Sequence, residues 1–182
     1  FNDHETFASV NVQDPVFPLA PEAQQVLSAE DFNPVAVMSN RPEPDHGRIR
    51  KYTRQGFSNK RIKTLEPFMR RRGNQLIDAM LAAGASAEFV DAFAFPLPGE
   101  TVFRFIGFPE ADDELLKQWC GDRKAFSWGR PTGAQQTEIA EQMLAYWRYC
   151  REFTASKQAN RGDDFTSEII TAHEENPDDI TY

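Results

Sequence analysis

Apolar residues that recur at intervals of three or four dominate this sequence, and this period constrains the fold more than any other feature. The longest stripe lies on one face of a predicted helix and comprises Ile139, Met143, Trp147, Cys150 and Phe153. A second stripe predicts a helix from Pro67 to Gly84 with its apolar face in the core. Its members are Phe68, Met69, Leu76, Ile77, Met80 and Leu81. The sequence therefore predicts a mostly α fold with little strand.

Start and stop signals predict further helices over residues 45–55, 98–106, 112–128 and 163–175, with a short helical piece at 22–27. Ser58 or Asn59 is expected to cap only a short turn before Pro67, and Asp163 is expected to cap the last helix. Residues 88–95 are rich in aromatics and are predicted to begin as a strand. No repeat or break in composition divides the chain, so residues 1–182 are expected to form a single unit.

The first 44 residues are predicted to be largely irregular. Three prolines fall within residues 15–21, which excludes a regular helix there, and a second loop runs from Asn33 to Pro44. A long, proline-rich and partly apolar loop more often covers a site than links two domains.

The net charge of −8 is unevenly distributed. Ten of the 20 Lys and Arg residues lie between Arg48 and Arg72, with the single acid Glu66, so the other ten basic residues face 27 acids (28 less one). A basic patch on an acidic protein can steer an acidic partner, neutralise an anion or attract nucleic acid, and the overall acidity makes nucleic acid the least expected. No membrane-spanning run and no secretory signal are recognisable, so a cytoplasmic location is expected.

Self-contained catalytic motifs are missing from the sequence. It has no Gly-rich phosphate loop, no G-x-S-x-G elbow and no H-E-x-x-H pair. Cys120 and Cys150 are too few for a disulfide framework and are expected to be free thiols, and the three histidines are too scattered to indicate a metal site.

Residues 42–58 carry the most informative motif, Pro-Glu-Pro-Asp-His-Gly-Arg-Ile-Arg-Lys followed by Gly56-Phe57-Ser58. His46 and Arg50 are four residues apart, so they share one helix face near its N-terminus. Two such donors suit a carboxylate, to which Arg offers a forked contact. The alternative is a solvated basic helix face, which the spacing alone favours.

This motif resembles the start of the C helix of bacterial cytochromes P-450, whose pattern is Asp-Pro-Pro-Glu-His-Thr-Arg-Leu-Arg-Arg followed by Ala-Phe-Thr or Ala-Phe-Ser. The residues that match it are Pro44, His46, Arg48 and Arg50. The residues that depart from it are Pro42, Glu43 and Gly47.

The resemblance covers nearly the whole chain. Residues 3–9 resemble the family's B helix, 61–67 the entry to the D helix, 95–112 the E-helix region and 163–170 the H helix. It implies the N-terminal portion of a single P-450 haem domain. Residues 1–44 would form the end of the B helix and the B–C loop, 45–84 the C and D helices, and 85–182 the E to H helices.

The resemblance implies a haem-thiolate monooxygenase, which inserts one oxygen atom from O2 into a small apolar or aromatic organic substrate. The cofactor would be haem b, with His46 and Arg50 at its propionates. The axial Cys is expected outside this chain, because neither Cys120 nor Cys150 has the glycines of a thiolate loop. No catalytic or metal-binding residue is therefore expected here, and the chain alone should be inactive.

The resemblance also implies two binding surfaces. Substrate contacts are expected from the B–C loop and the F–G region, at Val35, Val37, Met38, Phe126 and Trp128. Docking of a ferredoxin, flavodoxin or reductase as electron donor is expected at Arg48, Lys51, Arg54 and Lys60. Ordinary packing and solvated helix faces are the competing explanations. The competing function is a stand-alone helical binding module whose basic face, residues 48–72, recruits an acidic protein or nucleic acid.

Overall fold

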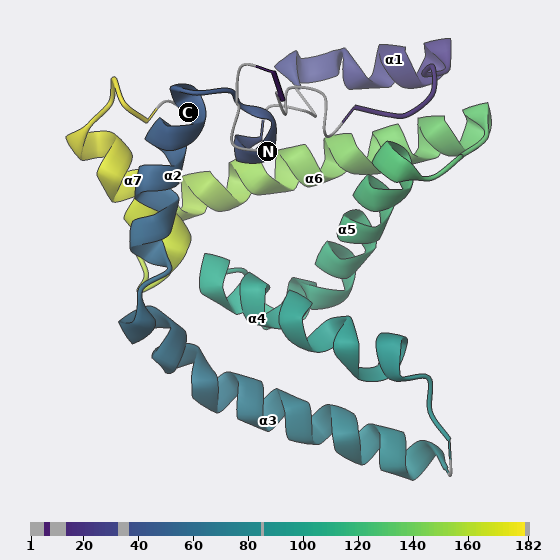
Figure 1. Cartoon of the computed structure of the whole chain (residues 1–182), viewed down its shortest axis with the longest axis vertical. Helices are drawn as coiled ribbons and strands as arrows, with labels where there is room; N and C mark the ends of the chain where they lie inside the picture. The colour runs from purple at the N-terminus through teal and green to yellow at the C-terminus, as the bar shows by residue number, and fades with distance from the viewer. Residues whose placement is uncertain (1–5, 8–13, 33–36, 85, 181–182) are drawn as a thin grey trace.

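The computed structural model describes residues 6–7, 14–32, 37–84 and 86–180, and these residues form helices and turns without a strand. The α-helices in this part are α1 (Pro21–Leu27), α2 (Asp45–Gly56), α3 (Asn59–Ala83), α4 (Pro96–Ile106), α5 (Asp113–Trp128), α6 (Gly133–Ala159) and α7 (Phe165–Glu175) (Figure 1). Four short helical turns accompany them: η1 (Ala29–Asp31), η2 (Met38–Asn40), η3 (Val90–Ala94) and η4 (Glu110–Asp112). The predicted mostly α class is confirmed.

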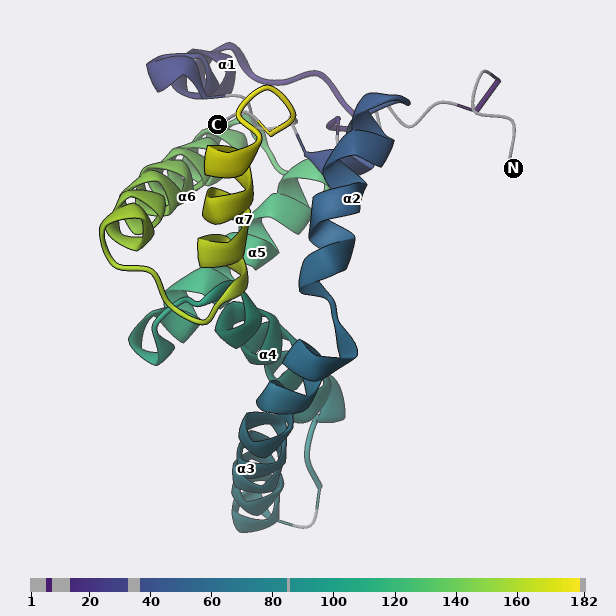
Figure 2. The same cartoon turned by 90° about the vertical axis from the view of Figure 1, so that its left-hand side faces the viewer.

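The long helix α6 is the element against which α1, α5 and α7 pack (Figures 1 and 2). Its start is fixed by a capping box, in which the Thr132 hydroxyl accepts from the Gln135 backbone and the Gln135 side chain accepts from the Thr132 N–H at 2.9 Å. One hydrophobic core fills the space between α1, α5 and α6. Its buried members are Ala23, Leu27, Phe126, Ala140 and Met143.

Helix α3 is continuous from Asn59 to Ala83, so the expectation that a helix begins at Pro67 is wrong. The helix starts earlier because the Ser58 hydroxyl accepts from the Arg61 N–H at 3.3 Å and caps it. Pro67 has no N–H to donate to the carbonyl of Lys63. Pro67 is exposed, so water can reach this part of the helix surface.

The apolar stripe of α3 is only partly in a core. Leu76 is buried, but Ile77 and Leu81 are exposed, which corrects the prediction for these two residues. They line an apolar groove together with Phe89 and Phe93, which follow in the chain. Helical periodicity identifies an apolar face but does not show what covers it.

A buried carboxylate joins α3, α4 and α5. Glu100 of α4 is 2% exposed and accepts hydrogen bonds from Arg72 of α3 at 2.9 Å and from Lys117 of α5 at 3.2 Å. Burial by itself would raise the pKa of Glu100, but the hydrogen bonds from Arg72 and Lys117 outweigh it and hold the pKa below its ordinary value.

Two further expectations are corrected near α4 and α7. Residues 90–94 form a π-helical turn rather than a strand, with the Phe95 N–H bonded to the Val90 carbonyl at 2.8 Å. A strand requires a neighbour to pair with, and the described part of the chain has none. The cap of α7 is Asp164 and not Asp163, because its Oδ1 accepts from the Ser167 N–H at 2.9 Å.

A stack of three phenylalanines anchors the end of α2 against α4 and α7. The ring centroids are 4.4 Å apart for Phe57 and Phe105 and 4.9 Å apart for Phe105 and Phe165. A Cβ atom at Gly56 would lie 2.3 Å from the Phe165 ring, so glycine at this position permits the close approach of α7.

Candidate functional site

The first turn of α2 holds His46 beside a carboxylate that precedes the helix. The Nδ1 atom of His46 lies 3.1 Å from Glu43 Oε1, and the Gly47 N–H donates to Glu43 Oε2 at 3.0 Å. A Cβ atom at position 47 would be only 2.7 Å from that same oxygen. Glu43 and Gly47, two departures from the family pattern, are therefore coupled: the missing side chain leaves room for the carboxylate.

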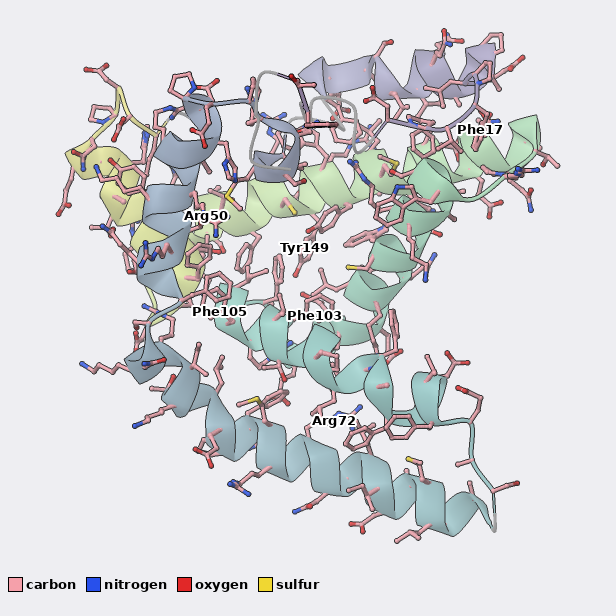
Figure 3. All side chains as sticks on the ribbon, viewed as in Figure 1. Phe17, Arg50, Arg72, Phe103, Phe105 and Tyr149 are labelled. Atoms are coloured by element: carbon pink, nitrogen blue, oxygen red, sulfur yellow. The ribbon has the colours of Figure 1, made fainter. Side chains whose placement is uncertain are left out.

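Arg50 lies one turn further along α2 (Figure 3). Its side chain is exposed and makes no ion pair or hydrogen bond with any residue that the structure describes. It lines an open groove of about 560 Å³ whose other lining residues are Gly47, Lys51, Arg54 and Gln55. Three cations and no acid line this groove, an arrangement that suits an anionic ligand.

The four cations predicted to bind an electron donor fall into two groups. Arg54 and Lys60 are exposed and have no ion pair within the described ranges. Arg48 is partly buried, with its Nη2 3.3 Å from Asp45 Oδ1, and Lys51 Nζ lies 3.7 Å from Asp179 Oδ2. The structure therefore leaves Arg54 and Lys60 open and gives Arg48 and Lys51 internal partners.

No family model matches the chain. Among curated proteins, it is 32% identical over 127 residues to cytochrome P450 GfsF of Streptomyces halstedii, covering 70% of this chain and 29% of the relative. It is 30% identical over 133 residues to mycinamicin IV hydroxylase/epoxidase of Micromonospora griseorubida, covering 72% and 32%. Among solved structures, cytochrome P450 CREJ in complex with (4-ethylphenyl) dihydrogen phosphate superposes with a TM-score of 0.88 at 31% identity over 98% of this chain and 44% of that one.

The chain belongs to the cytochrome P-450 family. It spans about a third of the length of the curated P-450 relatives it matches. The expected partial, helical P-450 fold is also confirmed, because the match to CREJ extends over nearly all of its residues.

The P-450 residues predicted to contact substrate do not gather in one place. Val35 lies outside the described residues. Val37 is 40% exposed, and Met38 is partly buried beside α2, with its sulfur 3.5 Å from the Thr53 hydroxyl. Trp128 is 60% exposed at the end of α5.

Phe126 lies in a different environment from the exposed Trp128. It is 2% exposed and packs among Leu27, Ala140 and Met143 between α1, α5 and α6. Two residues along a helix correspond to a rotation of about 200°, so Phe126 and Trp128 necessarily face opposite sides of α5. The structure thus assigns Phe126 to the core.

Both described cysteines, Cys120 and Cys150, are free thiols, and desolvation raises the pKa of each. Within the described residues, no group of three or more His, Cys, Asp or Glu side chains is placed to bind a metal ion. Among the same residues, no helix is both long enough and apolar enough to cross a membrane.

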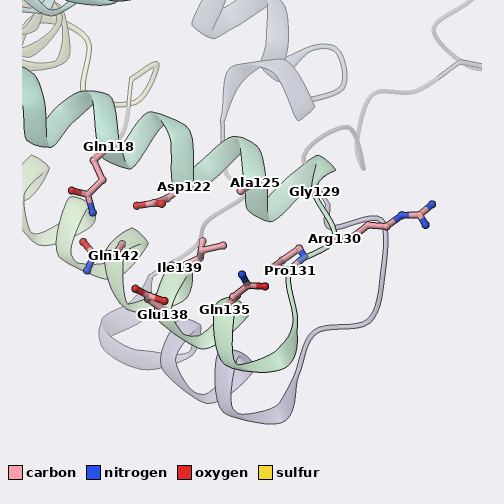
Figure 4. Close-up of a pocket in the computed structure, with 10 residues that line it drawn as sticks. All are labelled: Gln118, Asp122, Ala125, Gly129, Arg130, Pro131, Gln135, Glu138, Ile139 and Gln142. Atoms are coloured by element: carbon pink, nitrogen blue, oxygen red, sulfur yellow. The ribbon is translucent and has the colours of Figure 1, made fainter. Parts of the chain in front are cut away.

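A polar cavity of about 400 Å³ between α5 and α6 was not predicted from the sequence (Figure 4). Its polar lining includes Gln118 and Asp122 of α5 and Glu138 and Gln142 of α6. Burial raises the pKa of Asp122, and the nearby Glu138 raises it further. Polar pairs four residues apart are common on exposed helices, so only the pairing of the two helices reveals this cavity.

Proposed function

We propose that this chain forms part of the haem domain of a bacterial haem-thiolate monooxygenase, which inserts one oxygen atom from O2 into a small apolar or aromatic organic substrate. The observation that carries the proposal is the structural match to cytochrome P450 CREJ over 98% of the chain at 31% identity. The names of relatives support the reaction class, because one is a mycinamicin IV hydroxylase/epoxidase. We place the protein in the bacterial cytoplasm, in keeping with two free cysteines.

In this proposal, Arg50 and His46 bind the propionates of haem b. The fit rests on the exposed Arg50 guanidinium, which pairs with no acid among the residues that the structure describes and offers forked donors to a carboxylate. Glu43 occupies Nδ1 of His46, which leaves Nε2 for a propionate.

The haem, held by a Cys thiolate from outside this chain, supplies the oxygen chemistry when it is bound. The contribution of α2 is to hold and orient the cofactor at its edge. We propose no catalytic or metal-binding residue in this chain, and the chain alone should be inactive.

The electron donor in this proposal is a ferredoxin, a flavodoxin or a reductase domain that docks on the basic side of α2. Arg54 and Lys60 are exposed and Lys51 is largely so, which makes all three available to an acidic partner. Arg48 contributes less than the sequence suggests, since Asp45 already pairs with its guanidinium.

The proposed substrate contacts remain Val35, Val37, Met38, Phe126 and Trp128. Phe126 is the member of this set that is buried between α1, α5 and α6. Met38 lies beside α2, the helix that would bind the haem edge, so η2 is suited to a position near the cofactor. An aromatic substrate is supported by CREJ, which was solved with (4-ethylphenyl) dihydrogen phosphate.

The reduced, CO-bound absorption spectrum of the full-length protein that contains this chain tests the proposal. We expect the Soret band typical of thiolate-ligated haem. A protein without haem would contradict the proposal and favour the alternative, a helical binding module whose basic face recruits an acidic protein or nucleic acid. That alternative predicts binding at low salt that weakens steeply as salt is added.

A further inference from the structure

The turn that follows α7 is acidic and well ordered by its own hydrogen bonds. Residues 174–179 read Glu-Glu-Asn-Pro-Asp-Asp. The Asn176 N–H donates to the Ala172 carbonyl at 3.0 Å, and the Asn176 carbonyl accepts from the N–H groups of Asp179 and Ile180 at 3.1 Å each. This backbone network gives Asp179 a fixed position relative to α7.

Asp179 lies against the basic helix α2. Its Oδ2 accepts a hydrogen bond from the Tyr52 hydroxyl and lies 3.7 Å from Lys51 Nζ, while its backbone carbonyl accepts from Arg48. Three residues of one α2 segment thus contact one acidic residue more than 120 positions later in the chain. Figure 2 shows α2 and α7 side by side, which brings the turn to this face.

Two of these contacts involve cations of the proposed donor-docking surface, Arg48 and Lys51. The Asp179 carboxylate therefore places one negative charge beside that surface, and Asp178 and Glu175 are exposed on the same turn. An acidic donor that approaches Lys51 meets a cation whose charge is already partly balanced.

We propose that the Asp179 carboxylate is an internal counter-charge that competes with an acidic electron donor for Lys51, and so lowers the affinity of the α2 surface for that donor. The inference rests on the proposed function of this surface. It assigns a regulatory role to the turn after α7. Any change that draws the turn away from α2 frees Lys51 from its counter-charge, while Arg48 keeps its pairing with Asp45.

The test compares Asp179→Asn with Glu175→Gln in the full-length, haem-loaded protein, with a small acidic ferredoxin as the probe. Both variants remove one negative charge, but only Asp179 contacts α2. We expect Asp179→Asn to bind the ferredoxin roughly two- to fivefold more tightly at low salt, in the range of a surface ion pair, with little change for Glu175→Gln. Asp179→Glu, which keeps the charge, should bind as the parent protein does.

The contact itself has a readout that does not depend on the donor. The hydrogen bond to Asp179 raises the pKa of the Tyr52 hydroxyl, with burial as a second cause, so Asp179→Asn should lower this pKa in an ultraviolet titration. An unchanged Tyr52 pKa would show that the contact is absent and would overturn the inference alone. A lowered pKa without tighter ferredoxin binding would also overturn it. If Lys51→Ala and Arg54→Ala leave ferredoxin binding unchanged, the docking surface and the inference both fail.

Discussion

The two ends of the basic window between Arg48 and Arg72 lie in opposite environments. At the C-terminal end, Arg72 binds Glu100, a carboxylate only 2% exposed. At the N-terminal end, Arg50 and Arg54 line an open groove whose lining residues include no acid. A run of like charges in a sequence is therefore not one surface. The difference comes from α4, which brings a buried acid to one end only.

The comparison indicates different uses for the same residue type. A buried charge that loses its partner is strongly destabilising, so Arg72 is tied to the stability of the fold. An exposed Arg without an internal partner contributes little to stability and stays available for a ligand.

The largest effect is expected at the buried end. Glu100→Ala leaves Arg72 and Lys117 without their shared carboxylate and should lower the free energy of unfolding by about 3 kcal/mol. Glu66→Ala, which removes an exposed partner of Arg70 one turn away, should cost less than about 0.5 kcal/mol. Urea unfolding measures both. Equal losses of unfolding free energy in the two variants would contradict the distinction between the buried and the open environment.

Low pH should have the next largest effect, through two buried carboxylates: Glu100 at the buried end and Asp164 at the start of α7. The pKa values of Glu100 and Asp164 are held below their ordinary values of 4.5 and 3.8, since hydrogen bonds from cations outweigh the effect of burial. A lowered native pKa means that these acids bind fewer protons in the folded state, so their stabilisation is present above those ordinary values and is lost as pH falls through the lowered ones. Unfolding measured at decreasing pH should show a decline that begins near pH 4.5 and is shallower in Glu100→Gln.

At the open end, substitutions are expected to change haem retention rather than the stability of the fold. Arg50→Ala should speed haem dissociation by about tenfold, the cost of one charged hydrogen bond. It should change the free energy of unfolding by less than about 0.5 kcal/mol. Arg54→Ala, in the same groove, is the matched control and should retain haem normally. Equal haem loss in both variants would indicate a general charge effect rather than a propionate contact.

The smallest effect concerns how His46 is held. Glu43→Gln keeps the shape but removes the charge beside Nδ1, and should raise haem dissociation by roughly twofold. Gly47→Thr should act through the same carboxylate, because a side chain at position 47 displaces it. In a double-mutant cycle, the effect of the double variant on the rate of haem dissociation should therefore be smaller than the sum of the two single effects. Additive effects would show that the two residues are not coupled.

The sequence predicted those features that depend on near neighbours. The bounds of α2 and α5 followed from caps and stop signals, and the shared side of His46 and Arg50 followed from their spacing. It failed where a distant segment decides the outcome. Glu100 meets Arg72 across 28 residues, and Asp179 meets Arg48 across 131. Pro67 misled the prediction because a capped helix can continue through an exposed proline.

The three stacked phenylalanines fix the C-terminal end of α2 near Gly56, so a small change in their packing would tilt the whole helix about this end. His46 lies ten residues from Gly56, or about 15 Å along the axis. A tilt of about 5° around the rings would move His46 by roughly 1.3 Å, enough to misplace a hydrogen bond. The alignment of the proposed propionate donors at one end of α2 therefore depends on ring packing at the other end, at Phe57, Phe105 and Phe165.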